Sequence, residues 1–161
     1  MHFAETELKA GRNDVVHDIL AFLAERMMAL NQEKRTTAKQ FLTDLKDFHN
    51  IDSRTLNPKT KLDEFWKLEA LDLFAHLHKN ARRLEEQKVR LSDKDEDKIR
   101  SRFAMATETL LPLETQIAFT DQLIDQIVYH LYDLTPEEIK IVEGENALDR
   151  DISTSFQSAD Y

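Results

Sequence analysis

The sequence SDKDEDKIRSRFAMATETLLPLETQIAFTDQLIDQIVYHLYDL, residues 92–134, contains the longest regular pattern in this chain. Apolar residues recur in it at alternating steps of four and three, with one threonine among them. An α-helix places residues with these steps on one side of its surface, where they must pack against a partner. The pattern therefore predicts one long helix with an apolar row. The row is Ile99, Phe103, Ala106, Leu110, Leu113, Ile117, Thr120, Ile124, Ile127, Leu131 and Leu134.

A second row of the same kind predicts the partner helix, over residues 13–48. Its members are Val16, Leu20, Leu23, Met27, Leu30, Lys34, Thr37, Phe41, Leu45 and Phe48. Four further apolar residues widen its first half, so we expect that half to be the better buried one; they are Val15, Ile19, Phe22 and Met28. Antiparallel pairing would place residues 16–30 opposite residues 117–131. This predicts an all-α fold, a long antiparallel helical hairpin resembling a coiled coil.

The remaining elements follow from turn and capping signals. Residues 49–60 are predicted to form a loop, followed by a helix over 61–89 that packs at one end of the hairpin. Capping boxes are expected at Thr60 with Asp63 and at Ser92 with Asp95. The long helix should continue through Pro112 with a kink. The sequence Thr135-Pro136-Glu137-Glu138 predicts a short helix over 136–143, closed by Gly144.

The composition supports this assignment. The 161 residues include 2 glycines, 3 prolines and no cysteine, and 33% of them are charged. These values are typical of a helical protein and exclude disulfides and thiolate metal sites. We expect one helical domain over 13–144, after a lead over 1–12 and before a disordered acidic tail over 145–161. Without a signal peptide or a membrane-spanning stretch, the chain is expected to be cytoplasmic.

No motif for catalysis or cofactor binding was found in the sequence. The six histidines lack metal-binding spacing, and the two isolated glycines exclude a loop that cradles phosphates. We therefore expect no metal ion, no cofactor and no catalytic residue in this chain. Whether it is part of an enzyme stays open.

Two groups of residues are candidates for binding. The net charge is −9, but residues 79–102 contain 9 basic and 6 acidic side chains, whereas residues 103–161 contain 2 and 12. The candidate DNA-binding residues are Lys79, Arg82, Arg83, Lys88, Arg90, Lys98, Arg100 and Arg102. The alternative, which we favour, is an ordinary solvated charged end. The candidate partner-docking residues are Asp121, Asp125, Tyr129 and Tyr132, for which an ordinary helix rim is the alternative.

The segment IDQIVYHLYDLTPEEIKIVE, residues 124–143, resembles the C-terminal helical region of adenine-specific DNA methyltransferases and of combined restriction-modification enzymes. Asp133 stands where that family usually has glycine. The segment LAERMMALNQEKR, residues 23–35, is similar to the opening of the same region. Nine positions match the closing motif: Asp125, Val128, Tyr129, Leu131, Tyr132, Leu134, Thr135, Glu138 and Ile139.

The resemblance implies a role in a restriction-modification system without catalysis by this chain. Family members methylate adenine with S-adenosylmethionine, using a glycine-rich loop and an Asn-Pro-Pro-aromatic motif on a separate domain. Neither is present here: the two glycines are isolated, and Asn57-Pro58 is followed by Lys59 where the motif has a second proline. We therefore expect a fragment or subunit that supports DNA recognition or docks onto a methyltransferase or restriction subunit. The alternative is a free-standing helical interaction or regulatory protein without DNA, and either could form a homodimer.

Overall fold

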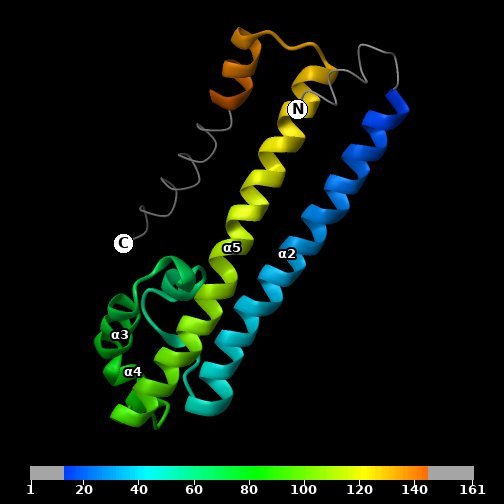
Figure 1. Cartoon of the computed structure of the whole chain (residues 1–161). Helices are drawn as coiled ribbons and strands as arrows, with labels where there is room; N and C mark the ends of the chain where they lie inside the picture. Colours follow the sequence, from blue (N-terminus) through cyan, green and yellow to red (C-terminus); the bar gives the residue numbers. More distant parts are fainter. Residues whose placement is uncertain (1–12, 145–161) are drawn as a thin grey trace. The chain divides into compact units, whose positions relative to one another are not determined.

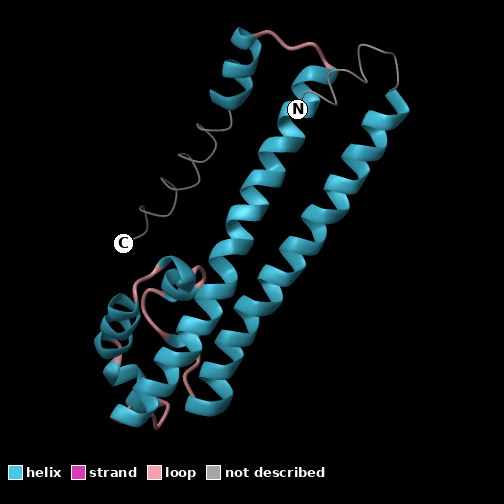
Figure 2. Cartoon of the chain, viewed as in Figure 1, coloured by secondary structure: helices cyan, strands magenta, loops and turns pink. Residues whose placement is uncertain are grey.

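The computed structural model describes residues 13–144, which are helical and contain no strand (Figure 2). The two long helices are α2, Asn13–His49, and α5, Asp93–Leu131, and a short helix covers 136–144. The predicted all-α class and the helix pair are confirmed. Residues 1–12 and 145–161, the predicted lead and tail, lie outside the described residues. The chain divides into two compact units, unit 1 with residues 1–24 and 121–161 and unit 2 with residues 25–120.

In unit 2, α2 and α5 run antiparallel, and polar pairs mark their register. Arg26 Nη2 donates to Gln116 Oε1 at 3.0 Å, and Lys34 Nζ donates to Glu114 Oε1 at 2.8 Å. The Arg102 guanidinium pairs with the Asp44 carboxylate further along. Residue numbers rise along α2 while they fall along α5, as the sequence predicts for an antiparallel hairpin.

The segment between the long helices forms most of the unit 2 core. Its elements are the 3₁₀ turns η1 Ser53–Thr55, η2 Lys59–Leu62 and η3 Phe65–Lys67, and the helices α3 Ala70–Lys79 and α4 Ala81–Glu86. In Figure 1, α3 and α4 lie beside α5. Phe65 is fully buried, with its ring centroid 4.1 Å from that of Phe41 and 6.0 Å from that of Phe103. This segment therefore covers one side of the helix pair.

The predicted continuous helix over 61–89 is wrong. Leu68 and Glu69 have extended backbone, and Asn80 separates α3 from α4. A 29-residue helix would spread its side chains over about 44 Å, at 1.5 Å per residue. The turns instead gather Leu62, Phe65 and Trp66 over one stretch of α2 and α5, which buries more apolar surface. The capping box predicted at Thr60 and Asp63 is also wrong, because η2 has no side-chain cap.

The first half of α2 is not better buried throughout, although its wider apolar face predicts this: Val16 and Leu30 are each 1% exposed, but two of the residues that widen the face are not buried. Phe22 and Met28 are 66% and 65% exposed, whereas Phe41 and Leu45 in the second half are 3% and 1% exposed. The second half is covered by the segment between the long helices. A wide apolar row therefore does not by itself bury every apolar residue of a helix, because burial also depends on what covers it.

Unit 1 has a smaller core. Within it, residues 13–24 of α2 pack against residues 121–131 of α5, with Val16, Leu23 and Ile127 buried and four half-buried residues around them. Val16 and Ile127 are members of the two predicted apolar rows, so the predicted pairing holds here. Leu131, at the end of α5, is 39% exposed.

The predicted capping boxes before α5 and before the 136–144 helix are present. The Asp95 backbone N–H donates to Ser92 Oγ at 3.3 Å, and the Ser92 N–H donates to Asp95 Oδ2 at 3.2 Å. Thr135 and Glu138 form the same reciprocal pair before the 136–144 helix. The long helix continues through Pro112, as predicted. No helix among residues 13–144 is long and apolar enough to cross a membrane.

Candidate docking surfaces

Three of the eight candidate DNA-binding residues contact residues of unit 2 that are distant in the sequence. Arg83 Nη1 donates to the Thr55 carbonyl at 2.9 Å, which ties α4 to η1. The Arg100 guanidinium lies 4.6 Å from the centre of the Phe74 ring. Arg102 pairs with Asp44 and also lies over the Phe48 ring at 4.4 Å. The side chains of these three residues therefore take part in packing, and each cation already has an interaction partner within the chain.

The other five candidates are exposed, as Arg83 and Arg100 also are, and two of the five lie near carboxylates. Arg82 is 3.9 Å from Glu86, one helical turn away, and Lys98 lies near Asp95. Lys88 and Arg90 belong to the loop before α5, and Lys79 ends α3. The eight residues thus come from four different parts of unit 2 and include both packed and solvated side chains. Whether these residues bind DNA or form only a solvated charged end stays a prediction.

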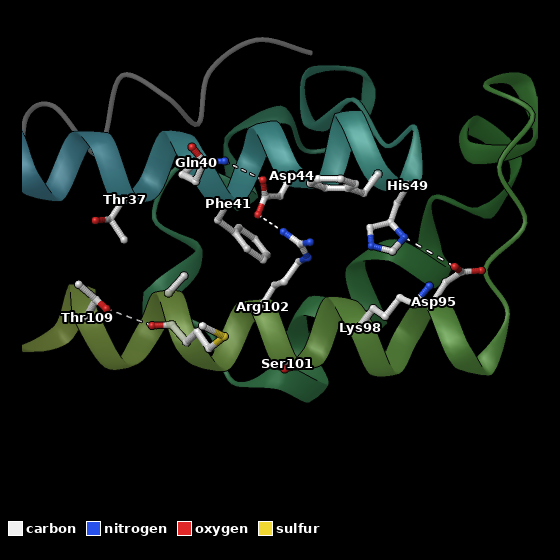
Figure 3. Close-up of a pocket in the computed structure, with 13 residues that line it drawn as sticks. Thr37, Gln40, Phe41, Asp44, His49, Asp95, Lys98, Ser101, Arg102 and Thr109 are labelled. Atoms are coloured by element: carbon white, nitrogen blue, oxygen red, sulfur yellow. Dashed lines mark hydrogen bonds and ion pairs between the residues drawn. The ribbon is translucent and has the colours of Figure 1, made fainter.

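In unit 2, a groove of about 800 Å³ lies between α2 and α5 (Figure 3). All its lining residues belong to these two helices, and none comes from residues 50–91. Phe41 and Ala106 are apolar lining residues, and Phe48 and Met105 are exposed at 64% and 67%. The groove lies where the segment between the helices leaves their surface uncovered, so it is open to another macromolecule.

His49 is the most buried titratable side chain that lines the groove. Its side chain is 5% exposed, its Nδ1 is 3.7 Å from Asp95 Oδ1, and its Nε2 has no hydrogen-bond partner among the described residues. Burial lowers the pKa of His49 below its usual value. The carboxylates of Asp95 and Asp44 oppose that shift, whereas Arg102 and Lys98 add to it. Burial also lowers the pKa of His76, helped by Lys61 and Lys79.

Because of these two histidines, we expect mild acid to lower the free energy of unfolding, already at pH values above those at which carboxylates titrate. Because their pKa is lower in the folded state than in the unfolded state, the unfolded chain takes up more protons near pH 6. The free energy of unfolding should therefore fall as the pH drops through about 6.5. Urea denaturation between neutral and mildly acidic pH measures this slope. The double variant His49→Gln with His76→Gln should flatten it, and an unchanged slope in that variant would contradict the prediction.

A second candidate surface lies in unit 1, at the end of α5 and on the 136–144 helix. Tyr132 is 71% exposed, Ile141 is 60% exposed and Val142 is 38% exposed. Three large apolar side chains thus face solvent within a short segment of unit 1. Isolated exposed apolar residues are common, but several in one segment are typical of interaction sites.

The structure brings three of the predicted docking residues together beside this segment. Partial burial raises the pKa of Asp125, and the carboxylates of Asp121 and Glu143 raise it further. Burial also raises the pKa of Tyr129, with contributions from Asp125 and Glu143. Asp121, Asp125 and Tyr129 are therefore near neighbours in an acidic rim. Tyr132 follows α5 in the turn and is the exposed aromatic residue of the four.

Among residues 13–144, no group of three or more histidine and carboxylate side chains is arranged to hold a metal ion. The groove residues Phe48, His49, Ser101 and Met105 were not candidates from the sequence. Ser101 and Met105 lie four positions apart, on the side of α5 opposite its apolar row. This spacing is the one sequence signal that could have indicated a second face of the helix.

Comparison with known protein families assigns this chain to one of them. The model of the family described as Domain of unknown function (DUF8810) matches residues 14–128, which is most of the chain. The chain belongs to this family. The DUF8810 match includes unit 2 completely and ends within α5. No curated protein and no solved structure shows significant similarity to the chain.

Proposed function

We propose that this DUF8810 protein is a non-catalytic docking module of a DNA restriction-modification system. Its partner is an adenine methyltransferase or restriction subunit, and the exposed closing segment of unit 1 is the surface that binds it. The observation that carries the proposal is the exposure of Tyr132, Ile141 and Val142 within the segment that resembles the end of those enzymes.

The backbone of the closing segment supports the resemblance. Asp133, which stands where the family usually has glycine, has a φ of 53°, a left-handed conformation that glycine adopts most easily. The Leu134 N–H donates to the Tyr129 carbonyl at 3.0 Å, as in a Schellman helix end. A glycine preference at this position therefore has a physical reason, which also applies at many other helix ends.

Docking is favoured over direct DNA recognition because three of the eight basic residues already have partners in unit 2. Arg83, Arg100 and Arg102 hold carbonyl, aromatic and carboxylate partners in unit 2. Binding phosphates would require these contacts to break or to be shared. DNA affinity in such a system would then come from the partner subunit.

The second candidate function is a free-standing helical interaction protein without a methyltransferase partner. The groove of unit 2 favours it, because this second open surface lies within the part that the DUF8810 family shares. The two candidate functions use different binding surfaces, so mutations in one surface or the other distinguish between them.

The test is binding of the purified chain to the adenine-specific methyltransferases of its source genome. The variant Tyr132→Glu with Ile141→Glu should weaken binding to the cognate enzyme at least about tenfold, because it places carboxylates in an apolar contact. Leu71→Glu is the matched control, since Leu71 is 77% exposed on α3 in unit 2. It should leave the affinity unchanged.

Two results would overturn this proposal. The first is the absence of binding to every adenine methyltransferase of that genome. The second is binding to generic duplex DNA by the chain alone, weakened steeply by salt and abolished by Lys79→Glu, Arg82→Glu and Arg90→Glu together. That second result would assign the exposed cations to phosphate contacts.

A further inference from the structure

We propose that the groove face of unit 2 is a homodimer interface, in which α5 of a second copy packs antiparallel against α5. The contact is made by a row of four exposed residues on α5, Lys98, Ser101, Met105 and Glu108. This inference uses a different unit from the proposed docking surface, so each can fail without the other.

The four residues lie on one side of α5, because their steps are three, four and three. Lys98, Ser101 and Met105 line the groove, and Glu108 continues the row by one turn. Met105 is 67% exposed, in contrast to Phe103 and Leu110 of the apolar row, which are 5% and 0% exposed. The row is therefore a second face of α5, distinct from the apolar row that packs against α2.

This row is complementary to itself when two copies run antiparallel. A two-fold axis at the level of residue 103 places Lys98 opposite Glu108 of the second copy, and the reverse pair forms by symmetry. The same axis places Met105 opposite Ser101, so that a large flexible side chain meets a small one. Both charge and size thus match in one register, and a parallel arrangement would place like charges together.

The surroundings of the row favour a second copy over a strongly charged partner. The charged lining residues of the groove are Asp44, Asp95, Lys98 and Arg102, which have no net charge together, whereas the chain has a net charge of −9. Two copies would repel each other at most other surfaces, but this face avoids that cost. Phe48, exposed at 64% beside Arg102, adds apolar area at the edge.

Packing of this kind would also complete a familiar architecture. In unit 2 the segment 50–91 covers one side of the α2 and α5 pair, and the groove side has no described residue over it. A second helix pair on that side makes a four-helix arrangement with α5 and its copy at the centre. The apolar groove lining would then be removed from water.

Sedimentation equilibrium with charge-swap variants tests the proposal. The wild-type chain should sediment at twice the monomer mass. Lys98→Glu and Glu108→Lys should each weaken the dimer at least about tenfold, because either change creates two like-charge contacts. The double variant should regain the dimer, since the ion pairs return with their signs exchanged. Lys39→Glu, at an exposed position on α2 outside the groove, is the control.

A cross-link provides a second measurement that does not depend on charge. The chain contains no cysteine, so the single variants S101C and M105C introduce one thiol each. An oxidised mixture of the two should form a covalent dimer more readily than either variant alone, because residue 101 faces residue 105 of the other copy. A monomeric wild type, a double charge variant that stays monomeric, or no preference for the mixed cross-link would overturn the proposed interface.

Discussion

Phe65→Ala should lower the free energy of unfolding of unit 2 by about 3–5 kcal/mol. Phe65 is fully buried at the centre of an aromatic cluster, with ring centroids 4.1 Å from Phe41 and 5.4 Å from Trp66. Truncation to alanine removes the burial of the ring and leaves a cavity between α2, α5 and η3. Because the neighbours belong to three separate elements, they cannot close the cavity by a small shift.

Urea denaturation followed by tryptophan fluorescence measures this loss directly. Trp66 is the single tryptophan of the chain and is 5% exposed in the same cluster, so its emission reports on unit 2. Phe119→Ala is the matched control, because Phe119 also belongs to unit 2 and is 66% exposed. It should change the free energy of unfolding by less than about 0.5 kcal/mol. Equal losses in the two variants would mean that the described core is not the stabilising one.

Asn80→Ala should have the next largest effect, about 2–3 kcal/mol. Asn80 is 4% exposed between α3 and α4. Its Nδ2 donates to the carbonyls of Asn57 at 3.1 Å and His76 at 2.9 Å, and its Oδ1 accepts from the Asn57 N–H at 2.7 Å. Alanine cannot make these bonds, so backbone groups of the loop before η2 lose their partners in a buried place.

Asn31→Ala is the control for this variant. Asn31 is half-buried, and its Nδ2 donates to the Met27 carbonyl at 2.9 Å, one turn away in α2. Its removal deletes a local bond, and the carbonyl keeps its bond within the helix, so we expect a loss below about 1 kcal/mol. The comparison is made by urea denaturation at neutral pH. A loss at Asn80 no larger than that at Asn31 would show that the Asn57 contact does not hold the loop.

The sequence was most informative where structure depends on neighbours along the chain. The helical ranges of α2 and α5 follow from apolar rows, and the boxes at Ser92 and at Thr135 follow from side chains three residues apart. Such interactions occur within one or two helical turns, so they can be read without knowing the fold. The all-α class follows for the same reason.

The candidate sites were less predictable. The eight basic residues form a cluster in the sequence, but Arg83, Arg100 and Arg102 are directed to partners that lie 28, 26 and 58 positions away. Those partners could not be named before the fold was known. The groove was missed altogether, because its lining comes from two helices that are distant in sequence and its openness depends on what leaves it uncovered.

The sequence by itself determined the long helices, their antiparallel pairing and two of the caps, since each depends on periodicity or on a short local motif. Only the tertiary structure decided that residues 61–89 form turns and two short helices, and that this segment buries Phe41 and Leu45 in the second half of α2. The physical reason is the same for both. Phe65, Trp66 and Leu77 lower the free energy most by packing against Phe41, Phe103 and Ile99, and local helix preference is too weak to oppose that burial.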